Sequence, residues 1–180
     1  MSRLPLIQPD TATGKAADLL ADVQKALGVT PNMTKVMVNS PAVLEAYLAF
    51  FSALSRGALS AATRERIALL VAEENACDYC LSAHTYIGAN IAKLTPAEIE
   101  SNRQGHSTDP KAAAALTFAT TVVRTRGGVA ESDVKQAKES GLTNAEIAEV
   151  IAAVSLNVFT NYLNKAADTD IDWPVVRHHA

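Results

Sequence analysis

Helical periodicity runs through almost the whole chain, and it limits the fold more than any other property of the sequence. Apolar residues return every three or four positions, the spacing that gives a helix one apolar side. Between these stretches stand Ser, Thr or Asp residues suited to begin helices and Gly residues suited to end them. The signals predict helices over residues 13–27, 31–38, 41–54, 60–75, 78–93, 132–139 and 143–167. Two further helices are predicted to begin at residues 95 and 110, and the second of these ends before residue 127.

Strand signals are weak by comparison. Val122-Val123 and Val175-Val176 are too short to form strands, and no segment alternates apolar and polar residues over a useful length. The connections are short, and 180 residues suffice for one substantial core. We therefore expect an all-α fold, a single compact helical domain over residues 1–180 whose tail, 168–180, is irregular.

The charge pattern argues against two classes of binding partner. Sixteen basic and 19 acidic residues give a net charge of −3, without a basic stripe or a polybasic tail. Nucleic acid and membrane surfaces are therefore not expected partners. Residues 1–9 lack the apolar run of a signal peptide, and no apolar stretch reaches a membrane-spanning length. We expect a cytoplasmic protein.

Both cysteines of the chain lie in one short motif with a histidine. Cys77, Cys80 and His84 are separated by three and four positions, so a helix would place them on one side. In a reducing compartment, such a close pair indicates redox catalysis or metal binding more than a structural disulfide. The motif therefore predicts either a redox site or a metal site.

The redox interpretation follows from thiol chemistry. At the start of a helix, the dipole and the free N–H groups favour thiolate over thiol. One thiolate can attack a peroxide, and the second cysteine can then close a disulfide before irreversible over-oxidation. His84 can move the proton, oriented by a carboxylate. Among the carboxylates of the preceding helix we favour Glu65, because a helix hairpin turning near residue 76 pairs position 65 with about position 87.

Other interpretations of the same residues stay open. A zinc site could use Cys77, Cys80, His84 and a carboxylate, although three ligands from one helix would be crowded. The cysteines could also be small buried apolar residues. His106 lies in a polar turn and is expected in solvent, while His178 and His179, near the C-terminus, are expected to fray.

The spacing resembles that of a known family. Glu65, eleven intervening residues and then Cys77-x-x-Cys80-x-x-x-His84 resemble the signature of the alkylhydroperoxidase D (AhpD-like) branch of the carboxymuconolactone decarboxylase family. Segments 40–47, 60–65, 142–147 and 157–162 resemble the helices of its peroxidase-related members. The resemblance covers roughly residues 35–175, which leaves an N-terminal helical extension and the irregular tail outside it.

The resemblance implies a function and an assembly. It implies a thiol-dependent peroxidase in which Cys80 attacks the hydroperoxide, Cys77 resolves the product, and Glu65 with His84 relays protons. The cycle would use no cofactor or bound metal, and a dithiol or protein reductant would restore the thiols. Members of the family commonly form homo-oligomers, either trimers or hexamers.

One position departs from the family pattern. The best-known peroxidase members have a second histidine directly before the second cysteine, where this chain has Tyr79. The departure keeps three alternatives open: a dithiol oxidoreductase or redox sensor with little peroxidase turnover, a helical oligomer that binds a metal or small ligand, and a carboxymuconolactone-type decarboxylase. Decarboxylase members generally lack the cysteine pair, so its presence favours redox chemistry.

Overall fold

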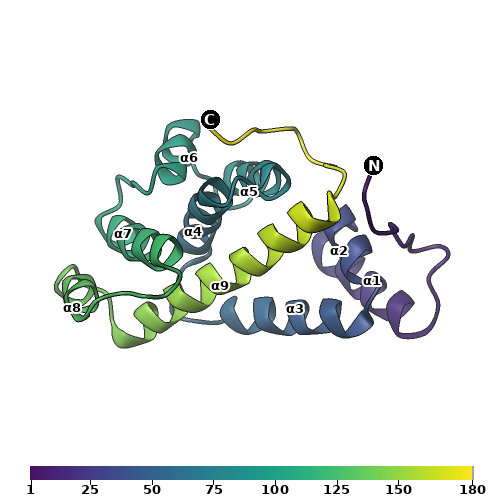
Figure 1. Cartoon of the computed structure of the whole chain (residues 1–180), viewed down its shortest axis with the longest axis horizontal. Coiled ribbons are helices and arrows are strands. Elements are labelled where there is room, and N and C mark those ends of the chain that lie inside the picture. Colours follow the sequence, from purple (N-terminus) through teal and green to yellow (C-terminus); the bar gives the residue numbers. More distant parts are fainter. Residues whose placement is uncertain (180) are drawn as a thin grey trace.

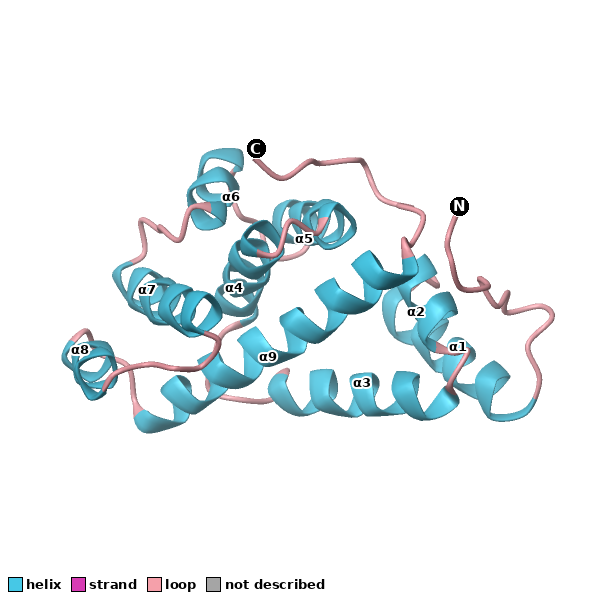
Figure 2. Cartoon of the chain, in the orientation of Figure 1, coloured by secondary structure: helices cyan, strands magenta, loops and turns pink. Residues whose placement is uncertain are grey.

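The computed structural model describes residues 1–179, and within this range the chain is helical without any strand (Figure 2). The all-α fold expected from the sequence is therefore confirmed. The helices are α1 (Gly14–Leu27), α2 (Asn32–Met37), α3 (Pro41–Leu54), α4 (Ala61–Glu74), α5 (Asp78–Asn90), α6 (Pro96–Arg103), α7 (Pro110–Thr125), α8 (Glu131–Glu139) and α9 (Asn144–Ala167).

Two helices organise the molecule. The long helix α9 crosses it diagonally, with α3 on one side and α4 and α5 on the other (Figure 1). Helix α4 packs against α5, α6, α7 and α9, and its residues 67–72 are all buried. A helix that is enclosed on all sides loses the one-sided apolar pattern, so α4 is the centre of the core. The two helices of the hairpin predicted around residue 76, α4 and α5, are thus held in place by packing.

The core has three parts. One apolar cluster joins α4, α7 and α9, a second surrounds the start of α5 and contains both cysteines, and a third joins α1, α2 and α3. The second cluster also receives residues of the C-terminal tail. The cysteines are therefore part of a packed core and lie under a cover formed by another segment.

Helix ends agree with the sequence where the signal is local. Thr143 and Glu146 form the expected capping box, with each backbone N–H donating to the other side chain. At Thr95 only half of the box exists: Thr95 Oγ1 accepts from the Glu98 N–H, but the Glu98 carboxylate turns to Arg66 and other partners. The complete box predicted there is wrong because a tertiary contact takes the glutamate.

The helix that contains the motif is shorter than its sequence suggested. Helix α5 ends at Asn90, not near Lys93, because Lys93 adopts a left-handed conformation with φ of 58°. The Leu94 N–H then donates to the Gly88 carbonyl at 2.9 Å, which closes the helix end.

The C-terminal tail is irregular, as expected, yet it is bound along its length. It crosses α5 and runs toward α6 (Figure 1). Ser82 of α5 holds the tail through Val176, whose N–H donates to the Ser82 hydroxyl at 2.9 Å. Asp78, at the first position of α5, accepts from the Arg177 guanidinium at 2.7 Å and lies 2.8 Å from Nδ1 of His178.

The two terminal histidines are therefore not frayed, and that prediction is wrong. His178 contacts Asp78, and Nδ1 of His179 lies 3.1 Å from a carboxylate oxygen of Glu73. These carboxylates sit at the α4–α5 turn, a position that the sequence around the histidines does not reveal. His106 is exposed, as expected.

Over residues 1–179, no single helix is both long and apolar enough to cross a membrane, although α8 and α9 together, as a bent pair, have the length and composition to do so.

Candidate active site

The turn between α4 and α5 places the two cysteines. Cys77 occupies the N-cap position of α5 and so precedes the helix, and Cys80 lies in the first turn. The Cys80 N–H donates to the sulfur of Cys77 at 3.4 Å. Ala76, in a left-handed conformation with φ of 48°, makes the turn sharp enough for this cap. Both cysteines carry free thiols and are 1–2% exposed.

The expected partner of His84 lies beside it. Nδ1 of His84 is 2.8 Å from Oε2 of Glu65, which belongs to the early part of α4. Both side chains are partly exposed, at 22% and 17%, so this pair is the part of the site that solvent reaches. Burial disfavours the imidazolium, but the adjacent Glu65 carboxylate outweighs burial and raises the pKa of His84. A raised pKa favours the protonated ring, which can donate a proton.

The two thiols differ in acidity. Burial alone would raise the pKa of Cys80, but the Cys77 hydrogen bond, the His84 charge and two asparagine amides lower it to about 7. The hydrogen bond to Cys80 and burial raise the pKa of Cys77. The directions of the two shifts favour the thiolate at Cys80 and the protonated thiol at Cys77.

Helix α9 supplies groups to the site that the sequence interpretation missed. Nδ2 of Asn164 donates to the sulfur of Cys80 at 3.3 Å, and Asn161 lies one turn earlier on the same helix. Both asparagines are almost fully buried, at 3% and 0%. A usable signal was present, because asparagines at positions 157, 161 and 164 repeat at helical spacing in an otherwise apolar stretch.

Tyr47 of α3 is a further neighbour. Burial, followed by the nearby charges of Cys80 and Glu65, raises the pKa of its hydroxyl. The hydroxyl therefore stays protonated beside the thiolate and the carboxylate. Nothing in the local sequence connected Tyr47 with the motif, since α3 meets the site only through the tertiary fold.

The hydroxyl of Tyr79 is hydrogen-bonded to groups outside the motif. It donates to Asp172 of the tail at 2.8 Å and accepts from the Met33 N–H at 3.0 Å. The residue that departs from the family pattern therefore joins α5 to the tail and to α2.

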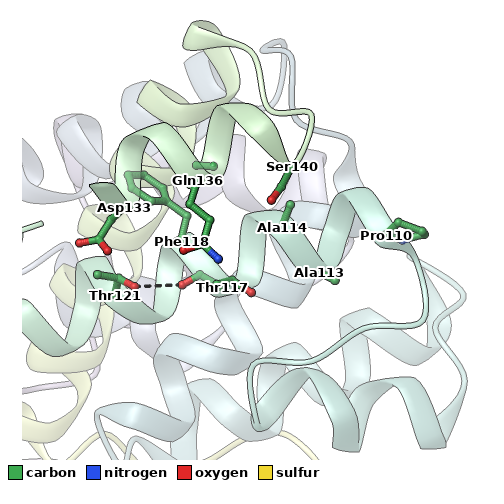
Figure 3. A pocket seen from close by; sticks show the side chains of 10 residues that line it. Pro110, Ala113, Ala114, Thr117, Phe118, Thr121, Asp133, Gln136 and Ser140 are labelled. Atoms are coloured by element: carbon green, nitrogen blue, oxygen red, sulfur yellow. Dashed lines mark hydrogen bonds between the residues drawn. The ribbon is translucent and has the colours of Figure 1, made fainter. Parts of the chain in front are cut away.

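In the described part of the chain, no three or more His, Cys, Asp or Glu side chains are arranged to hold a metal ion. A shallow hollow of about 270 Å³ lies between α7 and α8, where Phe118 and Gln136 contribute to its wall (Figure 3). It lies apart from the cysteines, and none of the four predicted site residues lines it.

Comparisons with known proteins agree with the motif. Residues 41–121, which include Glu65 and the cysteine–histidine motif, match the model of the carboxymuconolactone decarboxylase family. This match confirms the resemblance inferred from the spacing. No curated protein matches the chain.

Solved structures share the fold across nearly the whole chain. The alkylhydroperoxidase AhpD core of an uncharacterized peroxidase-related protein from Ralstonia eutropha JMP134 is 23% identical, with a TM-score of 0.84 over 95% of this chain and 92% of that one. An uncharacterized peroxidase-related protein from Silicibacter sp. TM1040 is also 23% identical, with a TM-score of 0.79 over 94% and 91%. The debrominase Bmp8, in complex with 2,3,4-tribromopyrrole, is 18% identical, with a TM-score of 0.75 over 96% and 94%. At these identities the likeness establishes an AhpD-like fold.

Proposed function

We propose that this chain, whose residues 41–121 match the model of the carboxymuconolactone decarboxylase family, is a thiol peroxidase that reduces hydroperoxides through Cys77 and Cys80. The observation that carries the proposal is the geometric asymmetry of the pair: the Cys80 sulfur accepts from Asn164, whereas Cys77 is the N-cap that accepts from the Cys80 N–H. The lowered pKa of Cys80 and the raised pKa of Cys77 agree with this asymmetry. Such asymmetry suits one attacking and one resolving thiol. The peroxidase-related structural neighbours add support.

The first step uses Cys80 and His84. The Cys80 thiolate attacks one oxygen of the hydroperoxide, so that a sulfur–oxygen bond forms while the oxygen–oxygen bond breaks. The protonated His84 ring supplies the proton to the leaving alkoxide, which departs as an alcohol. Glu65, 2.8 Å from Nδ1, stabilises the charged ring before the transfer. Cys80 is left as a sulfenic acid.

The second step uses Cys77. Its sulfur attacks the Cys80 sulfur, and the sulfenic hydroxyl leaves with the Cys77 proton as water. The product is a Cys77–Cys80 disulfide, formed between two residues that already share a helix N-cap. An external dithiol or protein reductant then supplies two electrons and two protons to regenerate both thiols. No cofactor enters the cycle.

A dithiol oxidoreductase or redox sensor with little peroxidase turnover is the second candidate. Burial of both sulfurs, at 1–2% exposure, favours the slow peroxide turnover of this candidate, because a hydroperoxide must displace covering side chains. Tyr79 adds to the case, since its hydroxyl is engaged with Asp172 and offers no second proton carrier. This candidate predicts reversible disulfide formation with slow peroxide turnover.

We also propose a homo-oligomer, a trimer or hexamer, formed through α3 and α9. Large apolar side chains are exposed on both helices: Phe50 and Phe51 on α3, and Ile151, Phe159 and Tyr162 on α9. Adjoining exposed apolar surface of this kind is typical of an interface. Light scattering coupled to size-exclusion chromatography measures the assembly, and a monomer at micromolar concentration would contradict the proposal.

Peroxide consumption with dithiothreitol as reductant tests the function. Cumene hydroperoxide and hydrogen peroxide are compared in wild type, Cys80→Ser and His84→Ala, with His106→Ala as an exposed histidine control. We expect Cys80→Ser to lose at least about 100-fold in rate and His84→Ala about 10–100-fold, with the control unchanged. Activity that survives Cys80→Ser would refute the assigned role.

Further substrates separate the remaining alternatives. Because one structural neighbour is a debrominase, 2,3,4-tribromopyrrole is assayed in parallel for bromide release. Bromide release without peroxide consumption would replace the peroxidase proposal by reductive dehalogenation. Lactone decarboxylation that is independent of Cys80 would favour the decarboxylase, and stoichiometric zinc lost in His84→Ala would favour a metal-binding protein.

A further inference from the structure

Three asparagines form a polar stripe on the buried side of α9. Asn157, Asn161 and Asn164 are 9%, 0% and 3% exposed, and their spacing of four and three residues puts them on one side of the helix. Burying an amide costs free energy unless both its N–H groups and its oxygen find partners. The three amides can therefore be sorted by the partners they have found.

Asn157 is satisfied locally. Its Nδ2 donates to the Ala153 carbonyl of the same helix at 2.9 Å. This contact lies within α9 and involves neither cysteine. Asn157 therefore stabilises its own helix and has no part in the chemistry of the motif.

Asn164 reaches the reactive sulfur. Its Nδ2 donates to Cys80 at 3.3 Å, a normal distance for a hydrogen bond to sulfur. The other end of the amide, Oδ1, is buried without a partner in the described chain. A buried amide oxygen without a partner lowers the stability of the fold, so stability alone does not explain why the Asn164 donor is directed at sulfur.

Asn161 is hydrogen-bonded to a fourth asparagine, Asn75. Its Oδ1 accepts from Nδ2 of Asn75 at 2.9 Å. Its own Nδ2 is buried and makes no hydrogen bond in the described chain. This buried donor lies one turn from Asn164 on α9, and the Asn161 amide is among the groups that lower the pKa of Cys80.

We propose that Asn164 is a positioning residue whose amide N–H group holds the Cys80 sulfur as a thiolate, with Asn161, hydrogen-bonded to Asn75, as a second buried donor one turn away on α9. The proposal rests on the proposed function in so far as Cys80 is the attacking sulfur. Hydrogen bonds to a charged acceptor are stronger than neutral ones, so the Asn164 donor stabilises the thiolate more than the thiol. Asn75 lies two residues before Cys77, and its side chain links the turn of the motif to α9.

Alkylation of Cys80 by iodoacetamide, followed against pH, tests the proposal. The parent protein is Cys77→Ser, in which Cys80 is the sole thiol and the serine hydroxyl can still donate to it. Asn164→Ala is expected to move the alkylation midpoint up by about one pH unit, and to slow alkylation at pH 7 about 5–10-fold. Asn161→Ala is expected to move the midpoint in the same direction by less. Asn157→Ala, the matched control, is expected to leave both quantities unchanged.

Two further measurements keep the test decisive. Asn75→Ala leaves both α9 amides in place and is expected to raise the midpoint by a smaller amount, since Asn161 loses only its hydrogen bond to Asn75. If circular dichroism shows that either α9 variant is unfolded, the proposal is tested by Asn75→Ala and by the isosteric Asn164→Asp. Asn164→Asp is expected to raise the alkylation midpoint most, because it replaces a hydrogen-bond donor by a negative charge.

The outcomes for this proposal and for the peroxidase function are separate. Unchanged midpoints in folded variants of Asn161 and Asn164, or an equal rise in Asn157→Ala, would overturn the positioning role even if the protein consumes peroxide. Shifted midpoints in a protein that consumes no peroxide would remove the peroxidase proposal and leave the positioning role intact.

Discussion

Nδ1 of His84 lies 2.8 Å from Oε2 of Glu65, although the two residues are 19 positions apart. The contact joins the early part of α4 to the middle of α5, the two arms of a hairpin that turns at residues 75–77. Because α4 is enclosed by four other helices, the register of the hairpin is set by packing on all sides. The carboxylate is thus held against the ring before any substrate arrives.

Replacing this carboxylate tests the relay. Glu65→Gln keeps a hydrogen-bonding side chain but removes the charge that raises the pKa of His84. We expect peroxide turnover to fall about 10–100-fold, since general acid catalysis contributes on this scale. Glu74→Gln is a matched control on the same helix, because Glu74 pairs with Arg124 at the surface. Equal losses in both variants would show that the effect is not specific to the relay.

The pH profile of turnover has two limbs with opposite causes. The pKa of Cys80 is lowered to about 7, so the thiolate forms, and the rate rises, as pH increases through about 7. The pKa of His84 is raised, so the ring stays protonated to higher pH than an ordinary histidine, and the rate falls once it loses its proton. In Glu65→Gln the falling limb is expected to move to lower pH. A profile that rises only near the ordinary thiol pKa would contradict this assignment.

Tyr79 is expected to matter for stability and not for chemistry. Tyr79→Phe removes the donor to Asp172 and the acceptor of the Met33 N–H, so we expect the free energy of unfolding to fall by about 1–3 kcal/mol. Peroxide turnover should stay within about twofold. Tyr86→Phe is the control on the same helix, because Tyr86 is 42% exposed and packs its ring on Trp173. A large loss of turnover in Tyr79→Phe alone would make the hydroxyl a proton carrier after all.

Glu98 is expected to give the protein a pH-dependent stability. Burial opposes its charge, but donors including Ser107, Asn102 and Thr108 outweigh burial and lower its pKa to about 2. A lowered folded-state pKa stabilises fully above the unfolded value of 4.5, and the contribution is lost as pH falls toward 2. Glu98→Gln should therefore lower the free energy of unfolding at pH 7 by about 2–3 kcal/mol.

Urea unfolding at several pH values measures this effect. The difference between wild type and Glu98→Gln is expected to shrink as pH falls from about 4.5 to 2.5, because both side chains become neutral. Glu100→Gln, on the same helix but 47% exposed, is the control and should change stability by less than about 1 kcal/mol. A pH-independent difference would mean that the carboxylate charge does not carry the stabilisation.

Most of the fold could be predicted because its signals are local. Pro at the first turn, Thr or Asp at the N-cap and apolar spacing act within a few residues, and α3, α7 and α9 begin where these signals stand. The predictions failed where a distant residue competed for a local group. Glu98 leaves its capping box for Arg66, and His178 binds the Asp78 carboxylate 100 positions away.

The candidate site likewise has a part that local sequence predicts and a part that depends on distant residues. By itself, the sequence determined the thiol pair, the histidine one turn later and a carboxylate within reach, because these residues lie on two consecutive helices whose geometry follows from residue spacing. Only the tertiary structure decided that Asn164 meets Cys80, since α9 lies more than 60 residues further along the chain. Which residue of α9 faces the sulfur depends on the rotation and axial position of that helix. Side-chain packing across the whole core sets both quantities, and no local pattern encodes them.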